Sequence, residues 1–201
     1  RAQVVGRGEA ARGTGAPSLA VSAAVRDALA DADAGVSVTR AAVALPHPGD
    51  SMPPAIAAVL GELLPEAPAP AAVNAGLASA VAEHWCGAAR GLSTIVALST
   101  GEHVTSGVIL NGTPWAGANG LAGSVGWLSI NPVEREDYRR LGGLEAEVSS
   151  SGMVRRIVWR IKSGDESVIA QQHGGDLSQV TASHVFQASR NGDGVSISVI
   201  K

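Results

Sequence analysis

The sequence has little cysteine, few aromatic residues and little charge. Cys86 is the single cysteine, so no internal disulfide can form and we expect a reducing, cytoplasmic setting. The 15 basic residues are outnumbered by 18 acidic ones, which leaves no basic field for nucleic acid. No apolar run approaches the roughly 18 residues of a membrane span, and no signal-peptide pattern opens the chain. We therefore expect neither nucleic acid nor a membrane as a partner of this chain.

The hydrophobic content of the sequence is high enough to form a hydrophobic core. Hydrophobic residues make up 45% of the 201, mostly alanine and valine, which excludes disorder as the default. Strand-like and helix-like segments alternate, and this alternation predicts an α/β fold. The chain opens at Arg1 rather than methionine, from which we expect it to be a piece of something longer.

Periodicity and turn signals place the predicted elements. The stretch 65–70, rich in proline and alanine, predicts a connector, and a turn cluster around Pro48 follows the first predicted strand. Ser18 is interpreted as the N-cap of the first helix, and Gly35 and Gly91 as helix stops. Helices are predicted at 19–34 (ending at Ala34), 55–64, 75–90, 154–161 and 181–190, and strands at 36–45, 94–99 and 104–110.

A mixed sheet is expected around the strands 94–99 and 104–110. These two should pair antiparallel, with helix 75–90 on one face, and Asn111-Gly112 is a strong hairpin signal after the second. The glycines that follow recur every third residue, which predicts tight turns where the backbone approaches something closely: Gly117, Gly120, Gly123 and Gly126.

General catalytic motifs are missing. There is no phosphate-binding loop of the Gly-x-x-x-x-Gly-Lys-Ser/Thr kind, and Ser124 lacks the glycine two residues earlier that a nucleophile elbow requires. Cys86 is interpreted as a small buried apolar residue. The histidines are scattered with no pair at ligand spacing, so each is interpreted as structural or solvent-facing: His47, His84, His103, His173 and His184.

Three stretches resemble the ROK family, which comprises bacterial sugar kinases, transcriptional repressors and uncharacterised relatives. They are AEHWCGAARGL at 82–92, VILNG with GANGLAG across 108–123, and GGLEA at 142–146 followed by Ser149. The match runs from about Ala41 to the C-terminus and is strongest from Asn74 to Ser149.

The resemblance implies an actin-like, ribonuclease-H-like fold with sugar and ATP bound between two α/β lobes. We expect residues 1–72 to be a partial N-terminal lobe with its connector. Residues 73–201 should be a partial second lobe that keeps remnants of the sugar loop, the phosphate loop and the glycine-rich turn. The family's first phosphate hairpin and its adenine-binding helices have no counterpart in the sequence, so the fold is expected to be incomplete.

The sugar loop departs from the family pattern at the chemical position. The family's Glu-Asn-Asp corresponds to Val73, Asn74 and Ala75, and alanine cannot act as the general base. No catalytic residue is therefore predicted. Asn74 and Glu145 are the surviving sugar-contacting positions, although Asn74 is equally interpreted as the N-cap of the helix that follows.

The phosphate loop and the zinc cluster are altered as well. The family's Gly-Thr-Gly-Ile-Gly-Gly-Gly appears as GEHVTSG at 101–107, so only Gly101 and Gly107 are kept as cofactor-binding candidates, and Glu102 would repel phosphate. ATP and magnesium are implied by the resemblance alone, and we expect neither to bind tightly.

No zinc is expected either, because the four zinc-ligand positions hold Trp127, Glu136, Tyr138 and Gly143. Trp127 is predicted to fill the sugar pocket rather than to stack on a sugar.

Three functions remain open at this point. The favoured one is a degenerate sugar-kinase-like protein with residual hexose binding or a structural role, assembled as a homo-oligomer. The alternatives are an active ATP-dependent hexokinase of the glucokinase type and the sugar-sensing domain of a ROK-type repressor.

Overall fold

The computed structural model describes residues 4–11, 15–33, 35–47, 49–133 and 135–201. The expectations that involve Arg1, Ala34 and Pro48 lie outside these residues. In chain order the elements are α1 (Pro17–Asp31), β1 (Ala42–Leu45), α2 (Pro54–Leu63), β2 (Ala71–Asn74), α3 (Ala75–Cys86), β3 (Ile95–Thr100), β4 (Val104–Leu110), β5 (Thr113–Trp115), η1 (Val125–Trp127), α4 (Glu136–Leu141), α5 (Gly143–Val148), α6 (Ser150–Lys162), α7 (Val168–Gln172), η2 (Leu177–Gln179), α8 (Ala182–Arg190) and α9 (Gly194–Ile200).

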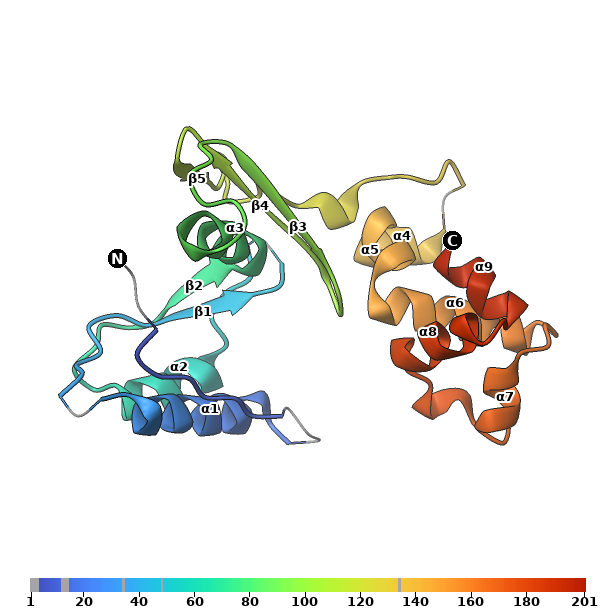
Figure 1. Cartoon of the computed structure of the whole chain (residues 1–201), viewed down its shortest axis with the longest axis horizontal. Coiled ribbons are helices and arrows are strands. Elements are labelled where there is room, and N and C mark those ends of the chain that lie inside the picture. The colour runs from blue at the N-terminus through green and yellow to red at the C-terminus, as the bar shows by residue number, and fades with distance from the viewer. Residues whose placement is uncertain (1–3, 12–14, 34, 48, 134) are drawn as a thin grey trace.

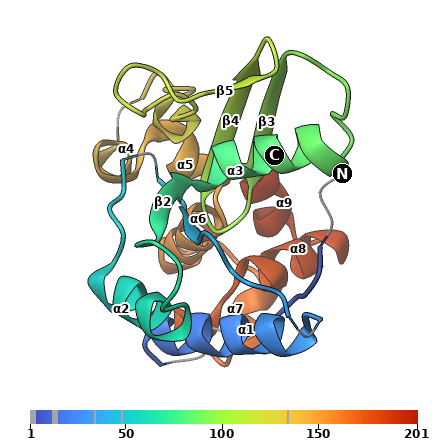
Figure 2. The same ribbon diagram turned by 90° about the vertical axis from the view of Figure 1, so that its left-hand side faces the viewer.

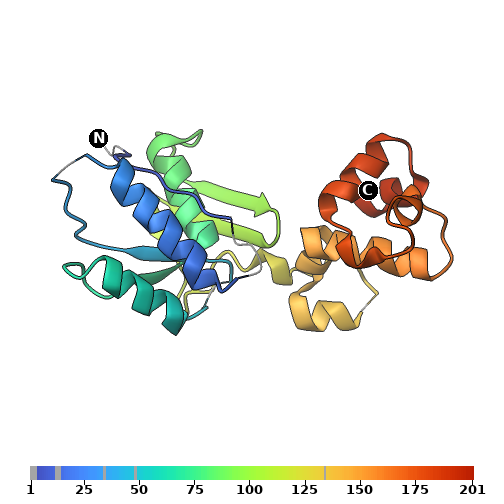
Figure 3. The ribbon, with the colours of Figure 1, turned by 90° about the horizontal axis from the view of Figure 1, so that it is seen from below.

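The elements form two bodies joined by the segment that carries η1. Helices α1 to α3 and all five strands make up the first body, and helices α4 to α9 make up the second (Figures 1 and 3). The predicted boundary between residues 72 and 73 falls within β2, and the division into two lobes at that point stays a prediction. None of the helices in the described part of the chain is both long and apolar enough to cross a membrane.

The strands form two sheets rather than the single mixed sheet expected. β3 pairs antiparallel with β4, and β4 with β5 through the Asn111-Gly112 turn, so the predicted hairpins are confirmed. β1 pairs only with β2, in parallel, from Ala42 opposite Ala71 to Leu45 opposite Asn74. The mixed sheet expected around β3 and β4 was wrong, because both pairings in that sheet are antiparallel and the parallel pairing of β1 with β2 lies in a separate sheet.

Helix α3 packs across β3 and β4, as predicted (Figure 2). Ala80 of the helix, Ile95 of β3 and Ile109 of β4 are buried together in the core of this body. The helix ends at Cys86 instead of residue 90, because Gly87 caps it through an N–H bond to the Glu83 carbonyl. Cys86 is exposed in this last turn, so its interpretation as a buried residue was wrong.

The N-terminal elements are shorter than their sequence patterns. The strand predicted at 36–45 is reduced to four residues, because only Ala42–Leu45 finds a pairing partner in β2. Ser18 is not the N-cap of α1: the helix starts one residue earlier at Pro17, whose fixed φ suits the first helical position. α2 matches its predicted bounds to within one residue.

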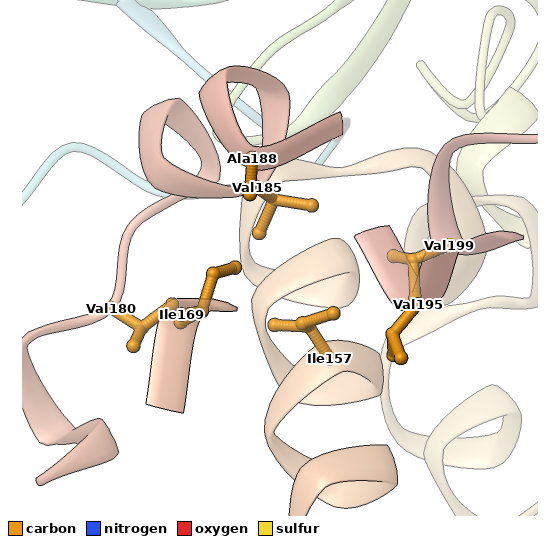
Figure 4. Close-up of a cluster of buried hydrophobic side chains, with 7 residues drawn as sticks. All are labelled: Ile157, Ile169, Val180, Val185, Ala188, Val195 and Val199. Carbon is orange, nitrogen blue, oxygen red and sulfur yellow. The ribbon is translucent and has the colours of Figure 1, made fainter. Parts of the chain in front are cut away.

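The second body is built around α6. Its core is a cluster of seven buried residues, one of them on α6: Ile157, Ile169, Val180, Val185, Ala188, Val195 and Val199 (Figure 4). α6 begins at Ser150 rather than residue 154, because the Ser149 side chain accepts a hydrogen bond from the Gly152 N–H at 3.1 Å and caps the helix. Thr181, predicted as the first helical residue of α8, is instead the N-cap in a capping box.

Candidate functional site

A small cavity lies where the β4 strand of the first body meets α5 of the second. Its volume is about 20 Å³, which suits a single water, whereas pockets for small-molecule ligands usually have roughly 300–1,000 Å³. The cavity therefore brings together many of the residues that the sequence singled out, but leaves no space for a hexose. Its walls include Asn74, Val104, Ser106, Gly123, Ser124, Gly126, Trp127 and Glu145.

Asn74 is occupied as a helix cap. Its side-chain oxygen accepts a hydrogen bond from the Leu77 N–H at 2.9 Å, which satisfies one of the free donors at the start of α3. Of the two interpretations of this residue, capping is the one observed, and sugar binding stays a prediction. Ala75 follows as the first residue of the helix and offers no group that can accept a proton.

Glu145 is the buried charge of the site. Its side chain is only 7% exposed, and one carboxylate oxygen accepts a hydrogen bond from the Val104 N–H at 2.7 Å. The other oxygen lies 3.2 Å from Nδ1 of His103. Both oxygens thus already have protein partners, and the carboxylate ties α5 to the start of β4. A role in sugar binding stays a prediction and would require these bonds to be exchanged.

Histidines that the sequence analysis treated as lone residues form pairs in the structure. The rings of His47 and His103 meet edge to face with centroids 4.8 Å apart, and those of His173 and His184 lie 4.7 Å apart. Nothing in the sequence spacing indicates these contacts, because the segments that carry the two histidines of each pair come together only on folding. Within the described ranges no three metal-ligating side chains gather into one group.

Ser106 was also missed by sequence reasoning. It is 1% exposed, lines the cavity, and its hydroxyl has no hydrogen-bond partner among the described residues. The signal was available, because side chains alternate along a strand and Ser106 lies two residues after the buried Val104. A buried hydroxyl without a partner beside a water-sized cavity indicates a water site.

The two glycines predicted to bind phosphate, Gly101 and Gly107, make backbone contacts within the protein. The N–H of Gly101 is bonded to the His103 carbonyl at 3.1 Å, and its carbonyl accepts from the Ser150 N–H at 2.8 Å. A Cβ on Gly107 would lie 2.2 Å from the Gly76 carbonyl oxygen, so this glycine allows α3 to pack on β4. Cofactor binding at Gly101 and Gly107 stays a prediction.

Two of the four positions that the resemblance assigns to zinc ligands, Trp127 and Gly143, hold residues without a ligating side chain. Trp127 borders the cavity with 60% of its surface exposed, so the prediction that it fills the pocket was wrong: η1 turns its side chain outward. Burial, followed by the hydrogen bond to the Glu147 carboxylate, raises the pKa of Tyr138, so its hydroxyl stays protonated. Gly143 has no side chain to offer.

The glycine-rich turn does make the close approach that was expected. Gly117, Gly120 and Gly123 all have positive φ, between 70° and 85°. A Cβ on Gly123 would lie 2.2 Å from the Ser106 carbonyl oxygen. Gly123 therefore allows the turn to lie against β4, where this glycine borders the cavity.

Replacing Glu145 with alanine should lower the free energy of unfolding by about 1–3 kcal/mol, because the buried Val104 N–H would lose its acceptor. Glu145→Gln keeps an acceptor oxygen and should cost less. Urea denaturation of both variants measures the difference, with Glu102→Ala as a control at an exposed glutamate. If Glu145→Ala were as stable as the unaltered chain, the structural role would be wrong.

The chain is similar in sequence to known sugar kinases and repressors. The model of the ROK family matches residues 68–201. A glucokinase of Halalkalibacterium halodurans is 29% identical over 127 residues, which cover 61% of this chain and 37% of that protein. The N-acetylglucosamine repressor of Escherichia coli O6:H1 is 26% identical over 123 residues, covering 61% of this chain and 29% of the repressor. The chain thus matches about a third of the length of each relative.

A solved structure shows the same arrangement of elements. The ROK glucokinase from Streptomyces griseus, crystallised with glucose and AMPPNP, superposes with a TM-score of 0.66 at 19% identity. The superposition covers 91% of this chain and 62% of that enzyme. The chain therefore has part of the actin-like α/β fold of these sugar kinases, as the sequence predicted.

Proposed function

Since the chain belongs to the ROK family, we propose that it is a sugar-kinase-like protein that has lost the capacity to transfer phosphate. The observation that carries the proposal is the cavity of about 20 Å³, in which both oxygens of Glu145 are already bonded by the protein. A hexose could enter only if β4 and the glycine-rich turn separated. Residual sugar binding would therefore be weak, and the structural role is favoured over it.

The missing base supports the same proposal. A sugar hydroxyl attacks a phosphoryl group efficiently only when a positioned group takes its proton, and such a group typically contributes 10²–10⁴-fold in rate. Ala75 stands at the position that the family resemblance assigns to this group. Its neighbour Asn74 is not basic and is held as a helix cap. Two titratable side chains line the cavity: Glu145 is bonded to His103 and Val104, and the ring of His47 lies edge to face against His103.

A sugar-sensing role is the second candidate, and one observation favours it. Asn74 and Glu145 still line one cavity although the base is lost, and a sensor needs to bind sugar without transferring phosphate. The likeness to the repressor as well as to the glucokinase supports neither role over the other. Sensing requires measurable hexose affinity, which the small cavity opposes.

A coupled assay of the purified chain with ATP and glucose, mannose or N-acetylglucosamine should show background rates only. Ala75→Asp should not restore turnover, since the nucleotide side is altered too, and Ala75→Asn is the matched control of equal shape without a base. Titration calorimetry with each sugar provides the second readout. Turnover that Glu145→Gln abolishes would overturn the proposal in favour of an active hexokinase. Binding without turnover would favour the sensor.

A further inference from the structure

A second, much larger cavity lies between α4 and α6. Its volume is about 690 Å³, within the usual range for small-molecule pockets. We call it the α4–α6 pocket. Residues from α4, α5 and α6 line it, and these helices lie together in the second body (Figure 1). No step of the proposed function uses it.

The charge of the α4–α6 pocket is positive. Its lining includes Arg135, Arg155, Arg156 and Lys162 against a single acidic residue, Asp137. Glu147, just outside the lining, pairs with Arg156 and lies 3.8 Å from Arg135. Counting both carboxylates, four cations face two anions, and the pocket keeps an excess of positive charge that favours an anionic ligand.

Arg155 has an unused donor at this pocket. Its Nε is buried and makes no hydrogen bond to any described residue. The nearest acidic atom, Oδ2 of Asp137, lies 3.9 Å away, which is beyond hydrogen-bond distance. The Arg155 side chain is 39% exposed, so its guanidinium can reach an acidic group in the pocket.

The remaining surface of the pocket is apolar and aromatic. Trp159 on α6 is 69% exposed, whereas Ile157, two residues earlier on the same helix, is fully buried in the core. Val154, Val158 and Tyr138 add to the same wall. An exposed tryptophan beside guanidinium groups suits a ligand with a flat apolar body, which can lie against the ring while its acidic group meets the arginines.

We propose that the α4–α6 pocket binds a small organic anion whose acidic group is carried on an aromatic or apolar body. The exposed part of the Arg155 guanidinium donates to a carboxylate, sulfonate or phosphate oxygen, and Trp159 contributes the apolar contact. The proposal does not depend on the proposed function. No residue lines both the α4–α6 pocket and the cavity at Glu145, although Ala146 of the pocket follows Glu145 on α5.

The test uses two fluorescent probes of nearly the same body. 8-Anilinonaphthalene-1-sulfonate carries an anionic group, and N-phenyl-1-naphthylamine lacks it. The sulfonate should bind saturably to one site per chain, and raising the salt from about 0.05 to 0.5 M should weaken the sulfonate more than the neutral probe. Equal salt dependence of the two probes would contradict the proposal without any variant.

Variants then assign the site. Arg155→Gln should weaken sulfonate binding about tenfold and leave the neutral probe unchanged, since only the charged acceptor uses the guanidinium. Trp159→Ala should weaken both probes. Arg140→Gln and Trp85→Ala are matched controls, because both residues are exposed and neither lines the pocket. Should Arg155→Gln unfold, as judged by circular dichroism, Lys162→Gln replaces it with a smaller expected loss. If Arg155→Gln and Trp159→Ala weakened sulfonate binding no more than the control variants do, the proposal would be overturned.

Discussion

Gly107→Ala should lower the free energy of unfolding by about 3 kcal/mol, the upper part of the range for overpacking a tight contact. The added Cβ would lie 2.2 Å from the Gly76 carbonyl oxygen and 2.5 Å from Cα of Leu77. Both are backbone atoms, so no side chain can rotate away and α3 itself must move off β4. That movement would also disturb the buried cluster of Ala80, Ile95 and Ile109.

Gly101→Ala is the matched control. No atom lies within 4 Å of a Cβ built on Gly101, and its backbone does not need a glycine. The change should therefore stay within about 0.5 kcal/mol. Urea denaturation of both variants is the measurement. The sequence analysis made both glycines candidates for phosphate binding. If Gly107→Ala were as stable as Gly101→Ala, the packing role of Gly107 would be wrong, and phosphate binding would be the remaining explanation for this glycine.

The second large effect is expected at Asp193, where alanine should cost about 3 kcal/mol. This carboxylate is 8% exposed and caps α9 through the Ser196 N–H at 2.8 Å. It also accepts from the Val168 N–H at 3.0 Å and from the hydroxyls of Ser167 and Ser196. Alanine would leave the two backbone donors without an acceptor and detach α7 from α9.

Asp176→Ala serves as the control for the loss of a cap. Asp176 is exposed and accepts from the Ser178 N–H at the start of a single 3₁₀ turn, so its loss should have a far smaller effect. Thermal and urea unfolding compare the two variants. Equal stabilities would show that the buried network around Asp193 contributes no more than an ordinary exposed cap.

The same carboxylate makes stability depend on pH. Burial raises the pKa of Asp193, but hydrogen bonds from Ser196, Val168 and Ser167 outweigh burial and keep the pKa below its ordinary value. The folded state therefore binds its proton less readily than the unfolded state. The contribution is complete above the unfolded pKa of about 4 and is lost as the pH falls through the lower folded pKa. The stability difference between the unaltered chain and Asp193→Asn should shrink over that acidic range.

The sequence alone determined the elements whose signals are local. The Asn111-Gly112 turn set the β4–β5 hairpin, because a two-residue turn of this type leaves neighbouring strands little choice of register. Helix α3 and the glycine-rich turn were found for the same reason, since periodicity and positive φ are properties of short stretches. The family motifs, also continuous in sequence, were sufficient to identify the fold.

The tertiary structure alone decided what the candidate site contains. The bonds of Glu145 to His103 and Val104, and the contact of His47 with His103, join residues that are far apart in the chain. The same is true of the separation into two sheets and of the α4–α6 pocket. Such contacts depend on how α3, α5 and the glycine-rich turn pack together. No local pattern carries that information, because burial and charge pairing arise only when distant surfaces meet.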